Sequence, residues 1–259
     1  MTELRLASWN LLHGRSLTNG QVDEDELRAG ARRLGADVVA LQEVDRGQLR
    51  SGGTDQAAAV AEATGASWWK FVPAVWGVPG QQWEPAATEH DERGDRSAYG
   101  IGLVSRLPVL GWDILRFPAA PVGMPLLVPG RGMVKVDDEP RLAISAVLSG
   151  PRGPFTVVGT HLSFVPGFNV RQLRQLTQWV VDKPAPRLLL GDLNLPGRLP
   201  AWISGWTQLA QVPTYPSWKP RVQLDHALGQ GIAPHQVLSV ESERLPVSDH
   251  NALAVTVTL

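Results

Sequence analysis

Short apolar runs that end in polar residues are the feature that most constrains this chain. The segments in which an apolar run passes into polar residues are 6–10 (LASWN), 38–43 (VVALQE), 157–161 (VVGTH), 190–194 (LGDLN), 224–226 (LDH) and 247–251 (VSDHN). Strand ends that carry carboxylate, amide and imidazole groups can hold a hard metal ion beside a proton-transfer group. One such cluster alone is weak evidence, because strands commonly end in polar residues. Their repetition along the chain predicts one shared site.

The order of these clusters resembles the endonuclease/exonuclease/phosphatase superfamily, which includes pancreatic-type DNases, abasic-site endonucleases, neutral sphingomyelinases and inositol-polyphosphate phosphatases. The resemblance spans Asn10 to His250. It implies an α/β (α+β) four-layer sandwich in which two packed mixed β-sheets are flanked by helices. It also implies metal-dependent hydrolysis of a phosphoester.

The hydrophobic pattern predicts the elements of this fold. Strands are expected at 4–9, 37–41, 100–104, 142–148, 155–160, 187–190, 224–228 and 252–259. Amphipathic helices are expected at 23–34, 55–64 and 170–181. A proline-rich stretch from 111 to 132 is expected to be a long excursion between strands. No linker divides the chain, so one domain over residues 1–259 is expected.

Composition limits the classes of partner and location. The net charge is −1, whereas non-specific nucleic-acid binders usually carry a basic surface. The chain has no cysteine, so any metal must use oxygen or imidazole ligands. No apolar run approaches membrane-spanning length and no signal-peptide pattern opens the sequence, so a cytoplasmic location is expected.

Glu43 is the best candidate metal ligand from the residues alone. It ends a buried strand, where an unpaired carboxylate is costly and a cation is a natural partner. By resemblance, Asn10 helps to position Glu43 and the metal environment, and Asp249 lies near the metal as a ligand or water activator. The expected ion is Mg²⁺ or Mn²⁺.

The expected catalytic residues are Asp192, Asn194, Asp225, His250 and His161. Asp192 and Asn194 alternate on an extended backbone and can face one phosphate. By resemblance, Asp192 orients or deprotonates the attacking water, Asn194 bonds a phosphoryl oxygen, and Asp225 supports the imidazole of His250. The resemblance assigns His161 to phosphate stabilisation or protonation of the leaving oxygen, as in DNase-like and sphingomyelinase-like members.

Several assignments stay open at this level. The carboxylate partner of His161 is sought among Glu84, Glu89, Asp91, Glu92 and Asp95. Phosphate-binding cations are sought among Arg50, Arg96 and Arg141, although a lone arginine is more often part of a surface ion pair. His226 is interpreted as a structural histidine.

The sequence therefore predicts a metal-dependent phosphoesterase that hydrolyses a phosphodiester by in-line attack of an activated water. The substrate is a small-molecule, lipid-headgroup or nucleic-acid phosphodiester. A DNA or RNA nuclease of the same family is one alternative. A catalytically inactive family member that acts as a binding module is another, although a scaffold has no chemical need for the acidic, amide and imidazole residues together.

Overall fold

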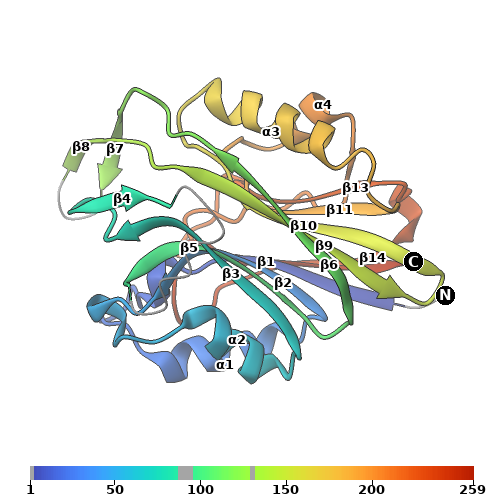
Figure 1. The fold of residues 1–259 in the computed structure, drawn as a ribbon, viewed down its shortest axis with the longest axis horizontal. Helices are drawn as coiled ribbons and strands as arrows, with labels where there is room; N and C mark the ends of the chain where they lie inside the picture. Colours follow the sequence, from blue (N-terminus) through green and yellow to red (C-terminus); the bar gives the residue numbers. More distant parts are fainter. Residues whose placement is uncertain (1–2, 87–95, 129–131) are drawn as a thin grey trace.

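The computed structural model describes residues 3–86, 96–128 and 132–259, which form two mixed β-sheets and a separate hairpin (Figure 1). The 7-stranded sheet has the order β14 (Val237–Glu243), β15 (Ala252–Thr258), β1 (Glu3–Asn10), β2 (Val38–Arg46), β5 (Ala98–Ser105), β3 (Trp68–Gly77) and β4 (Trp83–Pro85). The 6-stranded sheet has the order β12 (Thr207–Gln208), β13 (Asp225–Gln230), β11 (Arg187–Asp192), β10 (Gly153–His161), β9 (Arg141–Gly150) and β6 (Val109–Phe117). The hairpin pairs β7 (Met124–Val128) with β8 (Gly132–Val136).

The two sheets pack face to face with helices on both outer faces. Figure 1 shows α1 (Glu24–Leu34) and α2 (Gln56–Thr64) outside the 7-stranded sheet, and α3 (Phe168–Trp179) and α4 (Leu199–Ser204) outside the other. One apolar core fills the space between the sheets, and a further core lies under each pair of helices. Burial of these apolar side chains is the main driving force for the layered arrangement. The predicted four-layer sandwich is confirmed.

Parallel strand pairs at the centre of each sheet bring the polar strand ends together. β1 runs parallel to β2, with Asn10 beside Gln42, and β10 runs parallel to β11, with His161 beside Asp192. The antiparallel strand β13 begins with Asp225 opposite Asp192. Because parallel strands end at the same edge and an antiparallel neighbour begins there, these polar residues share one edge of the sandwich.

The predicted helices form where capping signals frame them. Asp23 accepts hydrogen bonds from the backbone N–H groups of Asp25 and Glu26, and Gly35 ends α1 in the left-handed conformation. At α2, Asp55 accepts a hydrogen bond from a backbone N–H of the first turn, and Gly65 ends the helix in the left-handed conformation. The third helix begins at Phe168, two residues before the predicted start. Each of these helices buries an apolar stripe against its sheet.

The expected excursion over 111–132 is partly wrong. Gly111 to Phe117 continue β6 and pair with β9, and Met124 to Val128 form one arm of the hairpin. Short 3₁₀ segments lie at Leu12–Gly14, Leu49–Ser51 and Pro234–Gln236. Within the described ranges, no helix has the length and apolar character needed to cross a membrane.

Candidate active site

Glu43 lies at a break in the pairing of β2 with β5. The register shifts between Leu41 and Val44, and Glu43 takes a positive φ of 53° that turns its side chain out of the regular alternation. The Asn10 Nδ2 donates to Glu43 Oε1 at 3.0 Å and to Asp192 Oδ2 at 3.2 Å. The Asn10 side-chain Oδ1 accepts from the backbone N–H of Leu12. Asn10 therefore joins the carboxylates of the two sheets through its amide N–H.

The charges around Glu43 favour a cation. Burial and the nearby Asp249 carboxylate raise the pKa of Glu43 to about 7, although Asn10 and His250 act in the opposite direction. Burial also raises the pKa of Asp249. Two neighbouring carboxylates that are each destabilised as anions fit a divalent cation, which would relieve the burial penalty and the repulsion together. Glu43 and Asp249 are therefore the residues that fit the predicted metal.

Asp192 lies at the centre of the polar strand ends. Its Oδ1 accepts the backbone N–H of Asn194 at 3.0 Å, and its Oδ2 lies 3.7 Å from His161 Nε2 and 3.8 Å from His250 Nε2. Burial raises the pKa of Asp192 to about 6, while the positive charge of His250 opposes this shift. The preceding Gly191 approaches Thr160 so closely that a Cβ would lie 2.1 Å from its carbonyl oxygen. Glycine therefore permits this close packing.

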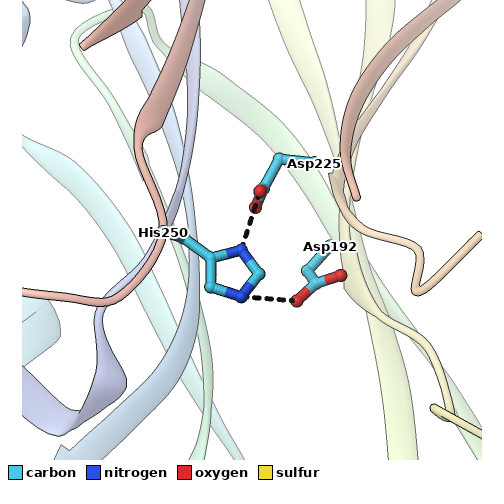
Figure 2. A group of neighbouring side chains, drawn as sticks. All are labelled: Asp192, Asp225 and His250. Carbon is cyan, nitrogen blue, oxygen red and sulfur yellow. Dashed lines mark hydrogen bonds and ion pairs between the residues drawn. The ribbon is translucent and has the colours of Figure 1, made fainter. Parts of the chain in front are cut away.

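His250 and Asp225 form a hydrogen-bonded pair, and Asp192 faces the other ring nitrogen (Figure 2). The His250 Nδ1 lies 2.8 Å from Asp225 Oδ2. Burial lowers the pKa of His250, but Asp225, Asp192 and Asp249 together overcome it and raise the pKa to about 10. The ring is therefore an imidazolium at neutral pH, with Nδ1–H directed to Asp225.

Asp192, Asp225 and His250 also satisfy the spacing of a metal site, because one ligand atom of each lies within 4.8 Å of the others. Both ring nitrogens already face carboxylates, however, and the 2.8 Å contact leaves no space between His250 and Asp225. An imidazolium cannot ligate a metal, since both of its nitrogens carry protons. The chemistry of this group favours an acid-supported imidazolium over a ligand set.

Arg141 lies closer to His161 than the Asp192 carboxylate does. Its Nη1 is 3.2 Å from Nδ1 and 3.4 Å from Nε2 of His161, and its guanidinium pairs with the buried Asp138. Asn194 Nδ2 lies 3.3 Å from His161 Nε2 and donates to the Leu162 carbonyl. Burial, Arg141 and His250 hold the pKa of His161 well below its usual value, so the ring is neutral.

The other predicted residues differ in their burial and in the groups they contact. Arg50 forms a two-pronged ion pair with the buried Asp45 and acts electrostatically on Glu43. Arg96 pairs with the exposed Glu84 and stacks on Trp76. Glu84 therefore does not support His161, and the other candidates, Glu89, Asp91, Glu92 and Asp95, lie outside the described residues. His226 is buried with its Nε2 at 2.8 Å from the Leu195 carbonyl, which agrees with a structural role.

Three residues near the site were not predicted from the sequence. Asp138 anchors Arg141 and also accepts from Ser163 Oγ at 2.7 Å. The Tyr215 ring lies 4.8 Å from the His250 ring. Tyr99 is buried and interacts electrostatically with Glu43 and Arg141. Only Asp138 had a sequence signal, because an acidic residue three positions before an arginine can pair with it.

Backbone strain is concentrated at this edge of the fold. Across the described ranges, the non-glycine residues with positive φ are Leu12, His13, Glu43, Asn194 and Ser248. Each lies within three residues of Asn10, Asp192 or His250, or is Glu43 itself. Such conformations cost roughly 1–3 kcal/mol each and persist where the surroundings enforce them. Ser248 is held by its N–H bond to the Arg15 carbonyl and accepts the His250 N–H at its Oγ.

Solved structures of several bacterial proteins share this fold. An endonuclease/exonuclease/phosphatase from Beutenbergia cavernae DSM 12333 has a TM-score of 0.65 at 21% identity, covering 100% of this chain and 72% of that chain. A family protein from Leptotrichia buccalis C-1013-b has a TM-score of 0.67 at 14% identity, covering 99% of this chain and 100% of that chain. Sphingomyelinase C from Streptomyces griseocarneus has a TM-score of 0.57 at 14% identity, with 100% of both chains covered.

The sequence comparison is more specific than these fold similarities. No curated protein matches the chain. Residues 7–250 match the model of the Endonuclease/Exonuclease/phosphatase family, a range that holds the candidate site residues from Asn10 to His250. Members of this superfamily are hydrolytic phosphoesterases. The chain therefore belongs to the endonuclease/exonuclease/phosphatase family.

Proposed function

We propose that this protein is a Mg²⁺- or Mn²⁺-dependent phosphodiesterase that uses an activated water for in-line attack on phosphorus. The observation that carries the proposal is the position of Asp192. Its Oδ2 faces His161 and His250 at 3.7 and 3.8 Å, distances too long for direct hydrogen bonds and suited to a bridging water. Asp192 would orient this water and accept its proton.

The imidazolium of His250 would neutralise charge on the phosphoryl group. Asp225 maintains both its protonation and its orientation through the 2.8 Å contact with Nδ1. Neutral His161 and the Asn194 amide would supply hydrogen bonds to phosphoryl oxygens, because the low pKa of His161 disfavours a role as a general acid at neutral pH. The cluster thus provides the aligned base and the positive charge that phosphoester hydrolysis requires.

Glu43 and Asp249 would hold the divalent cation, and Asn10 would keep Glu43 in place. When bound, the cation would supply Lewis-acid stabilisation of the developing negative charge. The expected hard ion agrees with an all-oxygen ligand set.

A small-molecule or lipid-headgroup phosphodiester is the favoured substrate class. The net charge of −1 gives the protein no general attraction for a polyanion, which disfavours a non-specific nuclease. Sphingomyelin is included among the substrates to be tested because one structurally similar protein is a sphingomyelinase C. The cytoplasmic location expected from the sequence stays a prediction.

The decisive assay compares sphingomyelin, plasmid DNA, RNA and chromogenic phosphodiesters, each with Mg²⁺, with Mn²⁺ and with EDTA. The Asp192→Asn variant is the matched control, because it preserves shape and removes the base. Metal-dependent turnover of a non-nucleic-acid diester that this variant loses would support the proposal. Turnover confined to DNA or RNA would favour the nuclease, and no turnover of any substrate would favour the binding module.

A further inference from the structure

Tyr99 lines a small recess between the two sheets, beside the proposed catalytic residues. It lies on β5 opposite Asp45 of β2 and belongs to the core between the sheets. The walls of the recess include Tyr99, Arg141, His161, Ala74, Ile101 and Leu142. Its free space of about 10 Å³ accommodates about one water-sized group. The recess therefore suits a single oxygen atom of a larger ligand.

Tyr99 is 7% exposed, and its hydroxyl forms no hydrogen bond with the residues that the structure describes. Its oxygen is not among the fully buried unpaired side-chain atoms, so the hydroxyl is open to a ligand. The adjoining polar walls are donors as well: Arg141 is fixed by Asp138, and His161 is a neutral imidazole with one N–H. An anionic oxygen is the ligand atom that satisfies such a set of donors.

The protonation state of Tyr99 agrees with a donor role. Burial, Glu43 and Glu139 raise its pKa well above the usual value, and this outweighs the opposite effect of Arg141 and Arg50. The phenol therefore keeps its proton at neutral pH. It is also close enough to the proposed metal ligand Glu43 for the two groups to interact electrostatically, so both can act on one bound phosphoryl group.

We infer that Tyr99 and Arg141 together bind one non-bridging oxygen of the scissile phosphoryl group, which makes Tyr99 a further catalytic residue. This inference rests on the proposed phosphodiesterase function. The hydroxyl would stabilise charge that grows on this oxygen as the water attacks. Its contribution should therefore appear mainly in kcat, with little change in KM.

The first test combines Tyr99→Phe with sulfur substitution in the substrate, using methyl p-nitrophenyl phosphate and the two enantiomers of its phosphorothioate. The variant should lose about 100-fold in kcat on the oxygen substrate, the scale for one lost oxyanion donor. The loss should shrink to near unity for the one enantiomer that places sulfur in the recess, because sulfur is a poor acceptor. Tyr215→Phe is the control, and any loss it causes should be equal for both enantiomers.

Less than a ~10-fold loss in Tyr99→Phe, or an equal loss with both enantiomers, would overturn the inference. A second test needs no turnover and leaves Tyr99 in place. The chain has 2 tyrosines, so protein labelled with 3-fluorotyrosine gives two ¹⁹F resonances, which Tyr215→Phe assigns. Orthovanadate added with Mg²⁺ should shift the Tyr99 resonance, and an unmoved resonance would also refute the inference. If wild type cleaves no phosphodiester while this shift occurs, the proposed function fails and the oxyanion recess stands.

Discussion

Replacing Glu43 with glutamine should make the metal-free protein more stable and remove its stabilisation by metal. Glutamine has nearly the same shape and can still accept the Asn10 N–H that now reaches Glu43 Oε1 at 3.0 Å. The substitution therefore removes the charge while it keeps the contact. Most substitutions near a buried site destabilise a protein, so an increase in stability is a specific expectation.

The magnitude follows from the raised pKa of Glu43, which moves from 4.5 to about 7. Between these values the folded state binds a proton that the unfolded state lacks, so stability falls as the pH rises through this window and then levels off. The full shift in the pKa of Glu43 corresponds to a decrease of roughly 3 kcal/mol in the free energy of unfolding. The carboxylate is partly exposed, and solvent screening reduces the expected gain to about 1–2 kcal/mol.

Thermal unfolding in EDTA at pH 8 and pH 4.5 measures this effect. At pH 8, Glu43→Gln should unfold a few degrees above wild type, since about 1 kcal/mol moves Tm by ~2–4 °C in a protein of this size. At pH 4.5 most of the difference should vanish. Mg²⁺ or Mn²⁺ at ~100 times its Kd should stabilise wild type by about 2.7 kcal/mol and the variant by far less.

Glu62→Gln is the matched control, because Glu62 pairs with Arg28 on the surface and its side chain is 75% exposed. This variant should stay within ~0.5 kcal/mol of wild type and keep its response to metal. A Glu43→Gln protein that is less stable than wild type at pH 8 would refute the electrostatic reasoning. An unchanged half-saturation by metal would remove Glu43 from the ligand set.

Three further predictions concern the imidazolium and the arginines. His250→Ala should lower kcat at least ~100-fold, and Asp225→Asn should reproduce most of this loss in steady-state assays. The pKa of His250 is raised from 6.5 to about 10, so the charged ring stabilises the fold fully below pH 6.5 and this stabilisation is lost as the pH rises through 10. The difference in unfolding free energy between wild type and His250→Gln should therefore shrink over this pH range. Arg141→Lys should lower kcat by ~10-fold or more because lysine lacks the planar fork that contacts Asp138 and His161 together, whereas Arg96→Lys should leave kcat nearly unchanged.

The sequence predicted the strand ends well, because their pattern depends on local chemistry. Asp192 and Asp225 follow apolar runs, and pairing in the sheet places them opposite each other. The strands that the sequence missed lack this clear pattern. β6 contains Gly111 and Asp113, and β3 contains Pro73 at a register shift. Pairing with neighbouring strands overrides the weak local preference of these segments.

Long-range contacts explain what the sequence left open at the site. Nothing local distinguishes Tyr99 from the apolar residues that follow it in β5, and only the packing of the second sheet turns it into a wall of the recess. His161 was expected to have a carboxylate partner, but the pairing of β9 with β10 places Leu142 opposite His161, and the preceding Arg141 contacts the imidazole ring. A one-residue change in register would exchange the faces of these side chains. The choice between Arg141 and Arg96 thus depends on pairing that the sequence does not reveal.

The charge balance of the site sets an order for binding. The carboxylates of Glu43, Asp192, Asp225 and Asp249 face the single imidazolium of His250, while Asp138 already pairs with Arg141. A phosphodiester anion would add negative charge to a buried region that already disfavours it, as the raised pKa values of Glu43 and Asp192 indicate. A cation at Glu43 and Asp249 would reverse this repulsion, and linkage requires that the anion strengthen cation binding by the same factor. We therefore expect substrate and metal to bind cooperatively, with the acidic strand ends making phosphodiester recognition conditional on the metal.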